Sequence, residues 1–413
     1  MRKFTMRMTA VALCLSAWSM QVAAENWITS LRDDVFVHQL SIPGTHDAAT
    51  GEGFESSFFD SFARTQDATL QEQWDSGIRA FDLRPTAVQT SSGERYLKIY
   101  HGIVETKMRF DEALRLLCRQ VKDNPGEFAV IIMRHETDGE KKDIGDLWEV
   151  LMDSCLNAEE FSGMLVPFRH SLKVGDMRGK VLVLSRDKYL NNKRLVGGYI
   201  SNWTHSSDIA DQKKAIINSK GLIKTSPLYV QDFYDCTNGK LPTKLEAMKT
   251  MFQEAGKALS RTTGTRTWAI NHASGYTRSA SANGNRENAV STHQTALDFL
   301  SSCEPGTPTG IVLMDFAGVD QSKDYEVKSL SLTRALIDNN KPYCQDGTGI
   351  NDAVAQGQEI TVEDGCVCAS SPLTVYDLHG RQLVAAACRV QLPKGHGIFM
   401  VRSASGACRV VTR

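Results

Sequence analysis

The feature that most constrains the fold is a repeated alternation between short β-rich runs and amphipathic segments. About eight runs have the length and β-branched content of strands, and helical periodicity marks several segments between them. The expected strands span residues 37–42, 77–84, 95–102, 128–135, 180–186, 228–234, 266–274 and 309–318. The expected helices span residues 109–124, 144–156, 242–259 and 287–303. This alternation predicts an α/β fold with a parallel sheet, and about 250–300 residues suffice to close it into a (β/α) barrel.

An open, doubly wound sheet is the alternative with the same alternation. Its dinucleotide-binding version needs a Gly-x-Gly-x-x-Gly turn that opens a helix, and no such turn is found in the sequence. From about Gly347 the pattern changes to short alternating strands broken by Gly, Asn, Asp and Pro turns. We therefore expect a barrel over residues 25–345 and a small, all-β, sandwich-like domain over residues 346–413.

The first 24 residues have the pattern of a signal peptide. A basic start is followed by an apolar run and by the small residues that signal peptidase accepts before Glu25. No other stretch reaches about 18 apolar residues, so we expect no membrane-spanning helix. The mature protein is expected to be exported: secreted, periplasmic or held at the cell surface.

Charge and cysteine content narrow the possible partners. The formal net charge of −1 gives no broad basic field for nucleic acid. Of the ten cysteines, Cys14 lies in the signal peptide, and the odd number that remains leaves at least one thiol unpaired. Cys366 and Cys368 are followed by no second pair at zinc spacing. We expect a monomer without a bound metal.

Polar residues follow the ends of most expected strands. In a (β/α) barrel the catalytic groups come from the C-terminal ends of several strands. The residues at these positions are His46, Asp47, Asp82, Arg84, His101, Arg134, His135, Arg186, Asp232, Tyr234 and Asp315. A single histidine after a strand is more often structural, but two histidines with arginines and carboxylates at corresponding positions indicate a site.

These residue types suit the cleavage of a phosphodiester by a neighbouring hydroxyl. That reaction needs a base for the hydroxyl proton, an acid for the leaving alkoxide, and cations that hold the phosphate oxygens. Histidine can take either proton role near neutral pH, because its ordinary pKa is about 6.5. Arginine offers a permanently charged, two-pronged contact to phosphate.

A set of motifs in a fixed order carries a resemblance to a known family. The motifs are "SIPGTHDAAT", "GIRAFDLRP", "IYHG", "FAVIIMR", "RGKVLVLSR", "YVQDFY" and "IVLMDF". Over roughly residues 28–340, the chain resembles the bacterial phosphatidylinositol-specific phospholipases C of the X-domain type, which fold as a distorted TIM barrel. The resemblance implies cleavage of phosphatidylinositol in a membrane surface, or of glycosylphosphatidylinositol anchors, to diacylglycerol and a 1,2-cyclic inositol phosphate.

The resemblance also implies roles for individual residues. It makes His46 the general base on the inositol 2-hydroxyl, His101 the general acid, Asp315 the carboxylate that orients His46, and Arg84 the phosphate clamp with Asp47 beside it. Asp82 either supports this group or is a structural carboxylate at the barrel rim. Arg186 and Asp232 match positions that bind inositol hydroxyls, and Tyr234 would stack on the ring. The family's lysine after the fourth strand is absent, and Arg134 or His135 stands there instead.

Arg84 decides the expected cofactor. Calcium-dependent relatives place a cation in the phosphate region, whereas the metal-independent bacterial type places an arginine in the "FDLR" motif. The arginine is present, so the resemblance implies no calcium requirement. The neighbouring Asp47 and Asp82 keep a calcium-dependent alternative open.

Aromatic residues close to the expected site predict a membrane contact. Phe54, Phe58, Phe59 and Phe62 follow the His46 loop, and Tyr276 lies in a Gly/Ser-rich loop. Exposed aromatic side chains at a rim are typical of proteins that act at a lipid surface. We expect Phe58, Phe59 and Tyr276 to touch lipid, although some of the phenylalanines could face the barrel.

Two other functions remain open, and the tail has two interpretations. A glycerophosphodiester phosphodiesterase would share the barrel but need a carboxylate metal cluster, and a catalytically silent protein that binds inositol lipid or glycan would keep the pocket. The tail motifs "VYDLHGR" and "LPKGHGIFMVR" resemble sorting modules of exported Bacteroidetes-type proteins. The alternative for the tail is a stabilising appendage.

Overall fold

The computed structural model divides into two compact units, residues 1–344 and 345–413. The residues it describes are 26–56, 58, 60–139, 145–188, 196–219, 225–278 and 283–345, with 361–363, 366–376, 382–392, 398–403 and 408–412 in the second unit. The expected signal peptide lies outside the described residues. Within the described part of the chain, no helix is long and apolar enough to span a membrane.

The centre of the first unit is a closed barrel of nine strands. Around the ring the order is β6-β2-β1-β13-β12-β11-β10-β9-β8, and β8 pairs back with β6. The strands are β1 (Ser41–Thr45), β2 (Ala80–Leu83), β6 (Phe128–Met133), β8 (Lys180–Ser185), β9 (Gly198–Ser201), β10 (Ala215–Ser219), β11 (Thr225–Gln231), β12 (Trp268–Ala273) and β13 (Gly310–Met314). The short β7 (Leu165–Val166) adds to β8 outside the ring. The expected α/β barrel is thus confirmed.

The barrel is mixed rather than fully parallel, so the expectation of a parallel sheet is wrong for one part of it. Strand β10 runs antiparallel to both β9 and β11, and neither β9 nor β10 was expected. A parallel neighbour requires a long crossover. The connection between β9 and β10 contains only the single-turn helix α6 (Ile209–Gln212), which is too short to bring the chain back.

The expected strand over residues 95–102 forms, but it does not belong to the barrel. It is β4 (Arg95–His101), the middle strand of a separate antiparallel sheet with β3 (Pro85–Gln89) and β5 (Val104–Arg109). Alternation along a strand does not reveal which sheet the strand joins. The position of His101 on the third barrel strand is therefore corrected to the end of this side sheet.

The first expected strand is displaced along the chain. Residues Val37–Gln39 form a short 3-10 helix, and β1 covers Ser41–Thr45 instead. Gly44 explains why the strand includes "PG": a Cβ there would lie 2.7 Å from Leu313 Cδ2 and 2.9 Å from Ala80 Cβ. The glycine lets β13 and β2 approach β1 from both sides.

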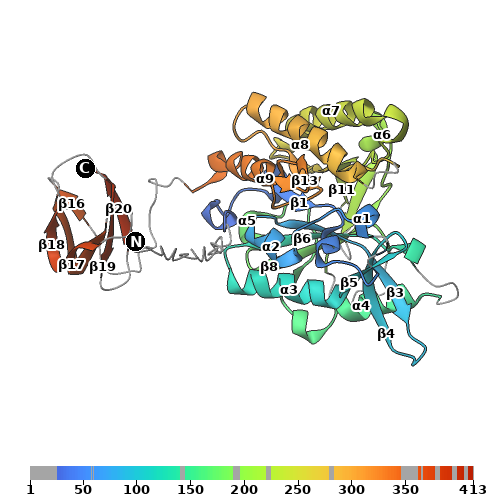
Figure 1. Ribbon diagram of the computed structural model, residues 1–413, viewed down its shortest axis with the longest axis horizontal. Coiled ribbons are helices and arrows are strands. Elements are labelled where there is room, and N and C mark those ends of the chain that lie inside the picture. The colour runs from blue at the N-terminus through green and yellow to red at the C-terminus, as the bar shows by residue number, and fades with distance from the viewer. Residues whose placement is uncertain are drawn as a thin grey trace, which may run out of the picture. The chain divides into compact units, whose positions relative to one another are not determined.

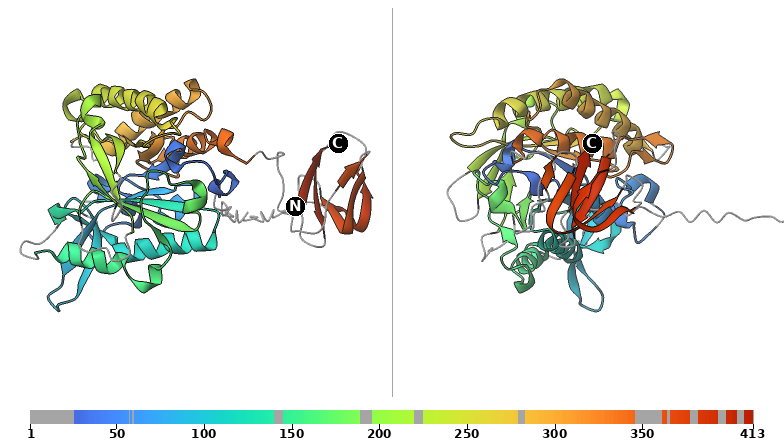
Figure 2. Two further views of the ribbon diagram at one scale, coloured as in Figure 1. Left: turned by 180° about the vertical axis from the view of Figure 1, so that it is seen from behind. Right: turned by 90° about the vertical axis from the view of Figure 1, so that its left-hand side faces the viewer.

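Helices surround the barrel. They are α1 (Asp60–Ala63), α2 (Leu70–Asp75), α3 (Phe110–Asp123), α4 (Leu147–Leu156), α5 (Val174–Met177), α7 (Leu241–Leu259), α8 (Gly284–Ser302) and α9 (Ser329–Asp338). Figures 1 and 2 show α7, α8 and α9 on one side of the barrel and α3 and α4 on the other. In α3 the buried residues recur at helical spacing, from Phe110 through Leu114 and Leu117 to Val121.

The side chains of the barrel strands alternate between two hydrophobic clusters. Inward residues such as Ile42, Val130 and Ile270 pack with one another inside the barrel. The residues between them, such as Phe81 and Ile131, pack against the surrounding helices. The alternation follows from the two-residue period of a strand, and it also decides which residues face the site.

The second unit is all β. It contains β16 (Thr361–Glu363), β17 (Cys366–Tyr376), β18 (Gln382–Gln391), β19 (Ile398–Ser403) and β20 (Cys408–Thr412). These strands form one antiparallel sheet with β17 near its centre. Its small core includes Val367, Leu373 and Val375.

Candidate active site

In seven of the nine barrel strands, all except β9 and β10, the inward face changes from apolar to polar at the C-terminal end. Below the change, Ile311 and Leu313 of β13 and Leu228 and Val230 of β11 fill the barrel. Two residues further along each strand, or just beyond it, the inward position is polar. These positions are His46, Asp82, Arg134, Arg186, Asp232, His272 and Asp315. A polar layer therefore closes the apolar core at one end of the barrel.

His46 is held from three directions. Its backbone N–H donates to the carbonyl of Met314 at 2.9 Å, which continues the β1–β13 ladder for one residue. Its carbonyl accepts the side-chain amide of Gln66 at 2.7 Å. Its imidazole Nδ1 donates to Asp315 Oδ1 at 2.8 Å. This leaves Nε2 as the nitrogen that can exchange a proton with a ligand.

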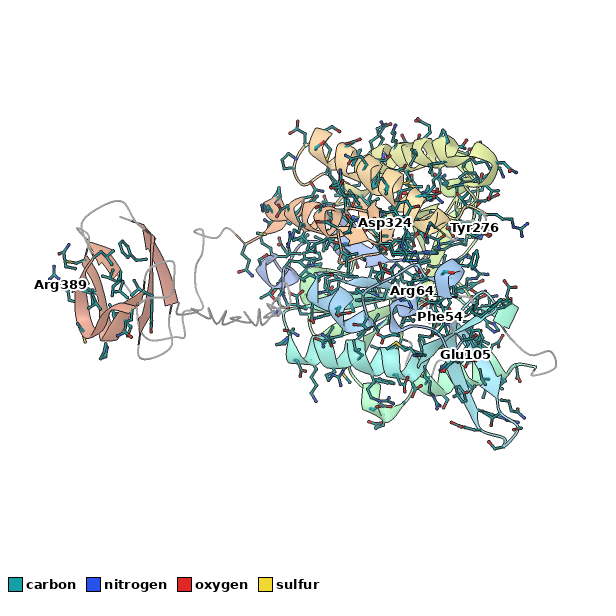
Figure 3. The ribbon with its side chains drawn as sticks, in the orientation of Figure 1. Phe54, Arg64, Glu105, Tyr276, Asp324 and Arg389 are labelled. Carbon is teal, nitrogen blue, oxygen red and sulfur yellow. The ribbon has the colours of Figure 1, made fainter. Side chains whose placement is uncertain are left out.

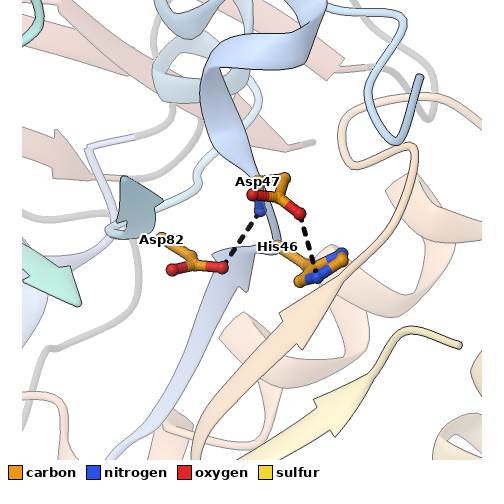
Figure 4. A group of neighbouring side chains, drawn as sticks. All are labelled: His46, Asp47 and Asp82. Atoms are coloured by element: carbon orange, nitrogen blue, oxygen red, sulfur yellow. Dashed lines mark hydrogen bonds and ion pairs between the residues drawn. The ribbon is translucent and has the colours of Figure 1, made fainter. Parts of the chain in front are cut away.

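Asp47 connects the other groups of the site. Its backbone has φ of +45°, a left-handed conformation that aspartate tolerates better than most residues. Asp47 Oδ2 lies 3.2 Å from His46 Nε2 and 3.4 Å from His101 Nε2, and its backbone N–H donates to Asp82 Oδ2 at 3.2 Å. Figure 4 shows Asp47 between His46 and Asp82. One carboxylate oxygen thus faces both histidines.

Arg84 lies between two carboxylates. Its Nε is 2.9 Å from Asp47 Oδ1, and its Nη2 is 2.8 Å from Asp82 Oδ2. A third carboxylate, Glu136, lies 3.9 Å from its Nη1. Burial raises the pKa of Asp82, but the positive charges of Arg84, His46 and His272 together outweigh burial, and the pKa falls to about 2. Asp82 therefore stays ionised and holds the guanidinium in place.

The electrostatics of His46 suit a general base. Burial lowers the pKa of His46, but the carboxylates of Asp47 and Asp315 outweigh burial and raise the pKa to about 8. An imidazole with this pKa can accept a proton from a hydroxyl and hold it as an ion paired with Asp315. Proton transfer by such a group typically contributes about 10²–10⁴ in rate.

His101 comes from the side sheet and lies beside Asp47, as His46 does. Its Nδ1 donates to the carbonyl of Ala63, at the end of α1, at 2.6 Å. The ring centroids of His101 and His46 are 6.4 Å apart with their planes nearly perpendicular. With Nδ1 occupied, Nε2 is the nitrogen that can give a proton to a leaving group.

A cavity of about 270 Å³ opens above these residues. Its far end is built around Asp232, whose Oδ2 accepts Trp203 Nε1–H at 2.8 Å and lies 3.0 Å from His205 Nδ1. Arg186 Nη1 is 3.9 Å from the same oxygen, and its guanidinium stacks on Trp203 at 4.0 Å. Burial lowers the pKa of Arg186 to about 10. The cavity thus has a histidine end and an Asp232–Arg186 end.

The remaining expected residues divide into two groups. Arg134, Tyr234 and Tyr276 line the cavity, and both tyrosines are partly exposed. His135, the alternative to Arg134, does not line it: its ring stacks on Trp148 at 4.4 Å. The interpretation that placed His135 in the inositol site is therefore not supported by its position.

The aromatic residues after the His46 loop differ in exposure. Phe58 is 79% exposed, whereas Phe54 is 5% exposed and lies under the guanidinium of Arg64. Figure 3 labels Phe54, Arg64 and Tyr276. Phe59 lies outside the described residues. Phe58 and Tyr276 thus present apolar surface to solvent, and Phe54 belongs to the core.

Known proteins share this architecture. No family model matches the chain. The chain is 22% identical over 262 residues to a 1-phosphatidylinositol phosphodiesterase of Staphylococcus aureus, with 61% of this chain and 75% of the relative covered. It is 27% identical over 193 residues to the protein of that name from Listeria monocytogenes, with 45% and 57% covered.

Solved structures agree with these relatives. A mutant of the phosphatidylinositol-specific phospholipase C from S. aureus matches with a TM-score of 0.60 and 19% identity, over 78% of this chain and 98% of that one. The L. monocytogenes enzyme matches with a TM-score of 0.53 and 21% identity, over 76% and 98%. The fold is that of the bacterial phosphatidylinositol-specific phospholipases C.

Within this phospholipase fold, several site residues were missed in the sequence. His272 follows Ile270 at the inward spacing of β12, so the two-residue period could have predicted it. It is fully buried, its ring centroid lies 5.8 Å from that of His46, and burial lowers its pKa to about 3. Trp203 and His205 lie on a loop, and no pattern marks them.

The same fold raises the question of a metal. His46, Asp47 and Asp82 each offer a ligand atom within 4.8 Å of the others. The guanidinium of Arg84 already bridges the two carboxylates. A cation there would have to displace this arginine, so the residues fit an arginine-based site better than a metal site.

Proposed function

We propose that this protein is a phosphatidylinositol-specific phospholipase C, a lyase that releases diacylglycerol and inositol 1,2-cyclic phosphate. The observation that carries the proposal is the placement of His46 and His101 on either side of Asp47, beside Arg84. The relatives named 1-phosphatidylinositol phosphodiesterase support the substrate class. Glycosylphosphatidylinositol anchors contain the same phosphodiester and belong to the proposed range.

The two histidines divide the proton transfers. The inositol 2-hydroxyl gives its proton to His46 Nε2 while its oxygen attacks phosphorus. The bond from phosphorus to the diacylglycerol oxygen breaks, and His101 Nε2 protonates the leaving alkoxide. Asp315 balances the charge on His46, and Asp47, 3.4 Å from His101, stabilises the protonated acid. The product keeps the phosphate in a ring with two inositol oxygens.

The other cavity residues bind the substrate in this proposal. Arg84 holds a phosphate oxygen, and Asp82 keeps Arg84 in place. Asp232 accepts hydrogen bonds from the inositol hydroxyls, and Arg186 donates hydrogen bonds to them. Arg134 supplies a further donor, and Tyr234 covers the inositol ring. Buried polar groups of this kind discriminate strongly against headgroups that lack the matching hydroxyls.

We propose that catalysis needs no calcium. A phosphate in this site needs positive charge next to it, and Arg84 supplies a charge that does not titrate in the working range. A metal-dependent glycerophosphodiesterase would need the position between Asp47 and Asp82 for its ion. The position of Arg84 between these carboxylates favours the metal-independent lyase.

We also propose where the protein works. Phe58 and Tyr276 contact the bilayer that contains the substrate, because the transfer of an exposed aromatic side chain from water into lipid is favourable. Residues 1–24 direct export, and the second unit acts in sorting or surface attachment. The protein works as a monomer.

Phosphorus NMR on phosphatidylinositol in mixed micelles tests the proposal. The wild type, in excess chelator, is expected to produce a cyclic inositol phosphate signal. His46→Ala and His101→Ala are each expected to abolish that signal. If phosphatidylinositol stays intact with and without added calcium, the lyase proposal fails and a silent lipid-binding protein becomes the better explanation.

A further inference from the structure

A group of buried polar side chains lies on the outer face of the barrel, behind the Asp232 end of the cavity. Gln231 and Asn271 pair in register at the ends of β11 and β12, and both are fully buried. Gln231 Nε2 donates to Asn271 Oδ1 at 2.7 Å and to the carbonyl of His272 at 3.0 Å. Gln231 Oε1 accepts the backbone N–H of Phe233 at 2.9 Å. These bonds join the two strand ends to each other.

Helix α7 completes this group through Lys244. The side chain of Lys244 is fully buried, and its Nζ donates to Gln231 Oε1 at 3.1 Å. One turn further along the helix, the carbonyl of Met248 accepts Asn271 Nδ2 at 3.2 Å. Helix α7 therefore holds both amides, and with them the ends of both strands.

A lysine is an expensive choice at this position. Taking an ammonium out of water is costly, whereas burying an apolar side chain of the same length is favourable. Burial lowers the pKa of Lys244 to about 8, and the neutral amine can still donate a hydrogen bond to Gln231. The hydrogen bond from Lys244 to Gln231 is therefore a contribution that an apolar side chain at this position could not make.

We propose that Lys244 is a positioning residue for recognition of the inositol headgroup, an inference that rests on the proposed function. Successive side chains in a strand point to opposite faces. Gln231 and Asn271 point outward, so the next residues, Asp232 and His272, point inward at the cavity end. The bond from Lys244 fixes the Gln231 amide, and this amide fixes the backbone that carries both inward side chains.

The position of Asp232 is sensitive to this support. Its Oδ2 already accepts Trp203 Nε1–H at 2.8 Å and lies 3.0 Å from His205. A small shift of the β11 end changes all of these contacts together. Misplacement of a binding group by about 1 Å can cost about 10²-fold. The effect falls on headgroup binding, because His46, His101 and Arg84 come from other elements.

Two substitutions separate hydrogen bonding from simple packing. Lys244→Met keeps the length of the side chain and removes the donor, whereas Lys244→Gln keeps a donor without an ammonium. Lys257→Met is the matched control, since Lys257 lies on the same helix, is exposed and pairs with Glu254. The readouts are KM and kcat for phosphatidylinositol in mixed micelles, the inhibition constant of myo-inositol, and the melting temperature.

Lys244→Met is expected to raise KM and the inositol inhibition constant together by roughly 10-fold, with kcat within about 3-fold of wild type. Lys244→Gln is expected to restore both constants to within about 3-fold, and Lys257→Met to leave them unchanged. A purely structural role would lower the melting temperature without changing either constant. A folded Lys244→Met protein with unchanged constants overturns the proposal.

The design remains decisive in the less favourable cases. If Lys244→Met does not fold, the test rests on Lys244→Gln, and a 10-fold rise in its inositol constant contradicts the role of the donor. If the wild type does not cleave phosphatidylinositol, the proposed function fails, and calorimetric titration with myo-inositol then compares wild type and Lys244→Met directly. Equal affinities, or no inositol binding by the wild type, overturn the inference.

Discussion

His46 and His101 face the same carboxylate but belong to different kinds of structure. His46 follows a barrel strand, and its backbone is fixed by Met314 and Gln66. His101 ends a strand of the side sheet, outside the ring, and its imidazole depends on the carbonyl of Ala63. The proposed base is therefore part of the barrel, whereas the proposed acid is brought to it by a contact between two peripheral elements.

The largest expected effect is the loss of activity when either histidine is replaced, and substrates with different leaving groups distinguish the two roles. His46→Ala and His101→Ala should each reduce the turnover rate of phosphatidylinositol by about 10²–10⁴-fold. With inositol p-nitrophenyl phosphate, the leaving phenolate needs no proton. His101→Ala should therefore recover most of its activity on this substrate, and His46→Ala should not. Stopped assays on both substrates measure the two ratios.

The reverse pattern would exchange the roles of the two residues. If His46→Ala recovered with the phenolate substrate and His101→Ala did not, the barrel histidine would be the acid. Equal losses on both substrates would mean that His101 acts on substrate position rather than on the leaving group.

A smaller effect is expected from Asp315, the carboxylate proposed to support the base. Asp315→Asn keeps the size of the side chain but removes its charge, so the protonated form of His46 loses one of its two carboxylate partners. We expect kcat/KM to fall by about 10²–10³, because the base is less well oriented and its ion is less stabilised. The melting temperature of Asp315→Asn, measured beside that of the wild type, shows whether a change in folding contributes to the loss.

The pH dependence of kcat/KM tests the role of Asp315 independently of the size of the loss in activity. The base must be neutral to act, and the pKa of His46 is about 8, so kcat/KM of the wild type should rise with pH through about 8. Removal of the Asp315 charge lowers the pKa of His46, and the rise should move to lower pH in Asp315→Asn. A rise that stays in place would mean that another group titrates.

The contrast between the two histidines also explains what the sequence could predict. The inward period of two, applied to Ile42, Gly44 and His46 or to Ile311, Leu313 and Asp315, predicts which side chains reach the open end of a barrel. His101 has no such rule, because its strand lies in another sheet. It was found as the polar end of an expected strand that was wrongly assigned to the barrel, and the resemblance carried by "IYHG" gave it a role.

The missed features have physical reasons of the same kind. His272 obeys the inward period, but it lies inside the expected strand over residues 266–274, two residues before the end of that range. Trp203 and His205 lie on a loop after β9, and their contact with Asp232 is set by tertiary packing. The antiparallel β9–β10 pair was missed because its residues are few and the connection carries only one helical turn.

The smallest expected effect concerns the surface near the acid. Ala63, whose carbonyl holds His101, ends α1, and Phe58 lies just before this helix with 79% of its surface exposed. Moving such a ring from water into lipid gains about 1.5–3 kcal/mol, so Phe58→Ser should weaken binding to lipid vesicles by roughly 10-fold or more. Vesicle sedimentation measures this loss.

Two further measurements show whether the effect of Phe58→Ser stays at the surface. Turnover of the soluble p-nitrophenyl substrate should be unchanged, because His101 is held by the backbone of α1 and not by the Phe58 ring. Phe54→Ser should do the opposite: it should lower the free energy of unfolding by about 3–5 kcal/mol, since this ring is buried. If Phe58→Ser also slowed turnover of the soluble substrate, His101 would depend on the same surface that contacts the membrane. His46, which is fixed by the barrel, would not share that dependence.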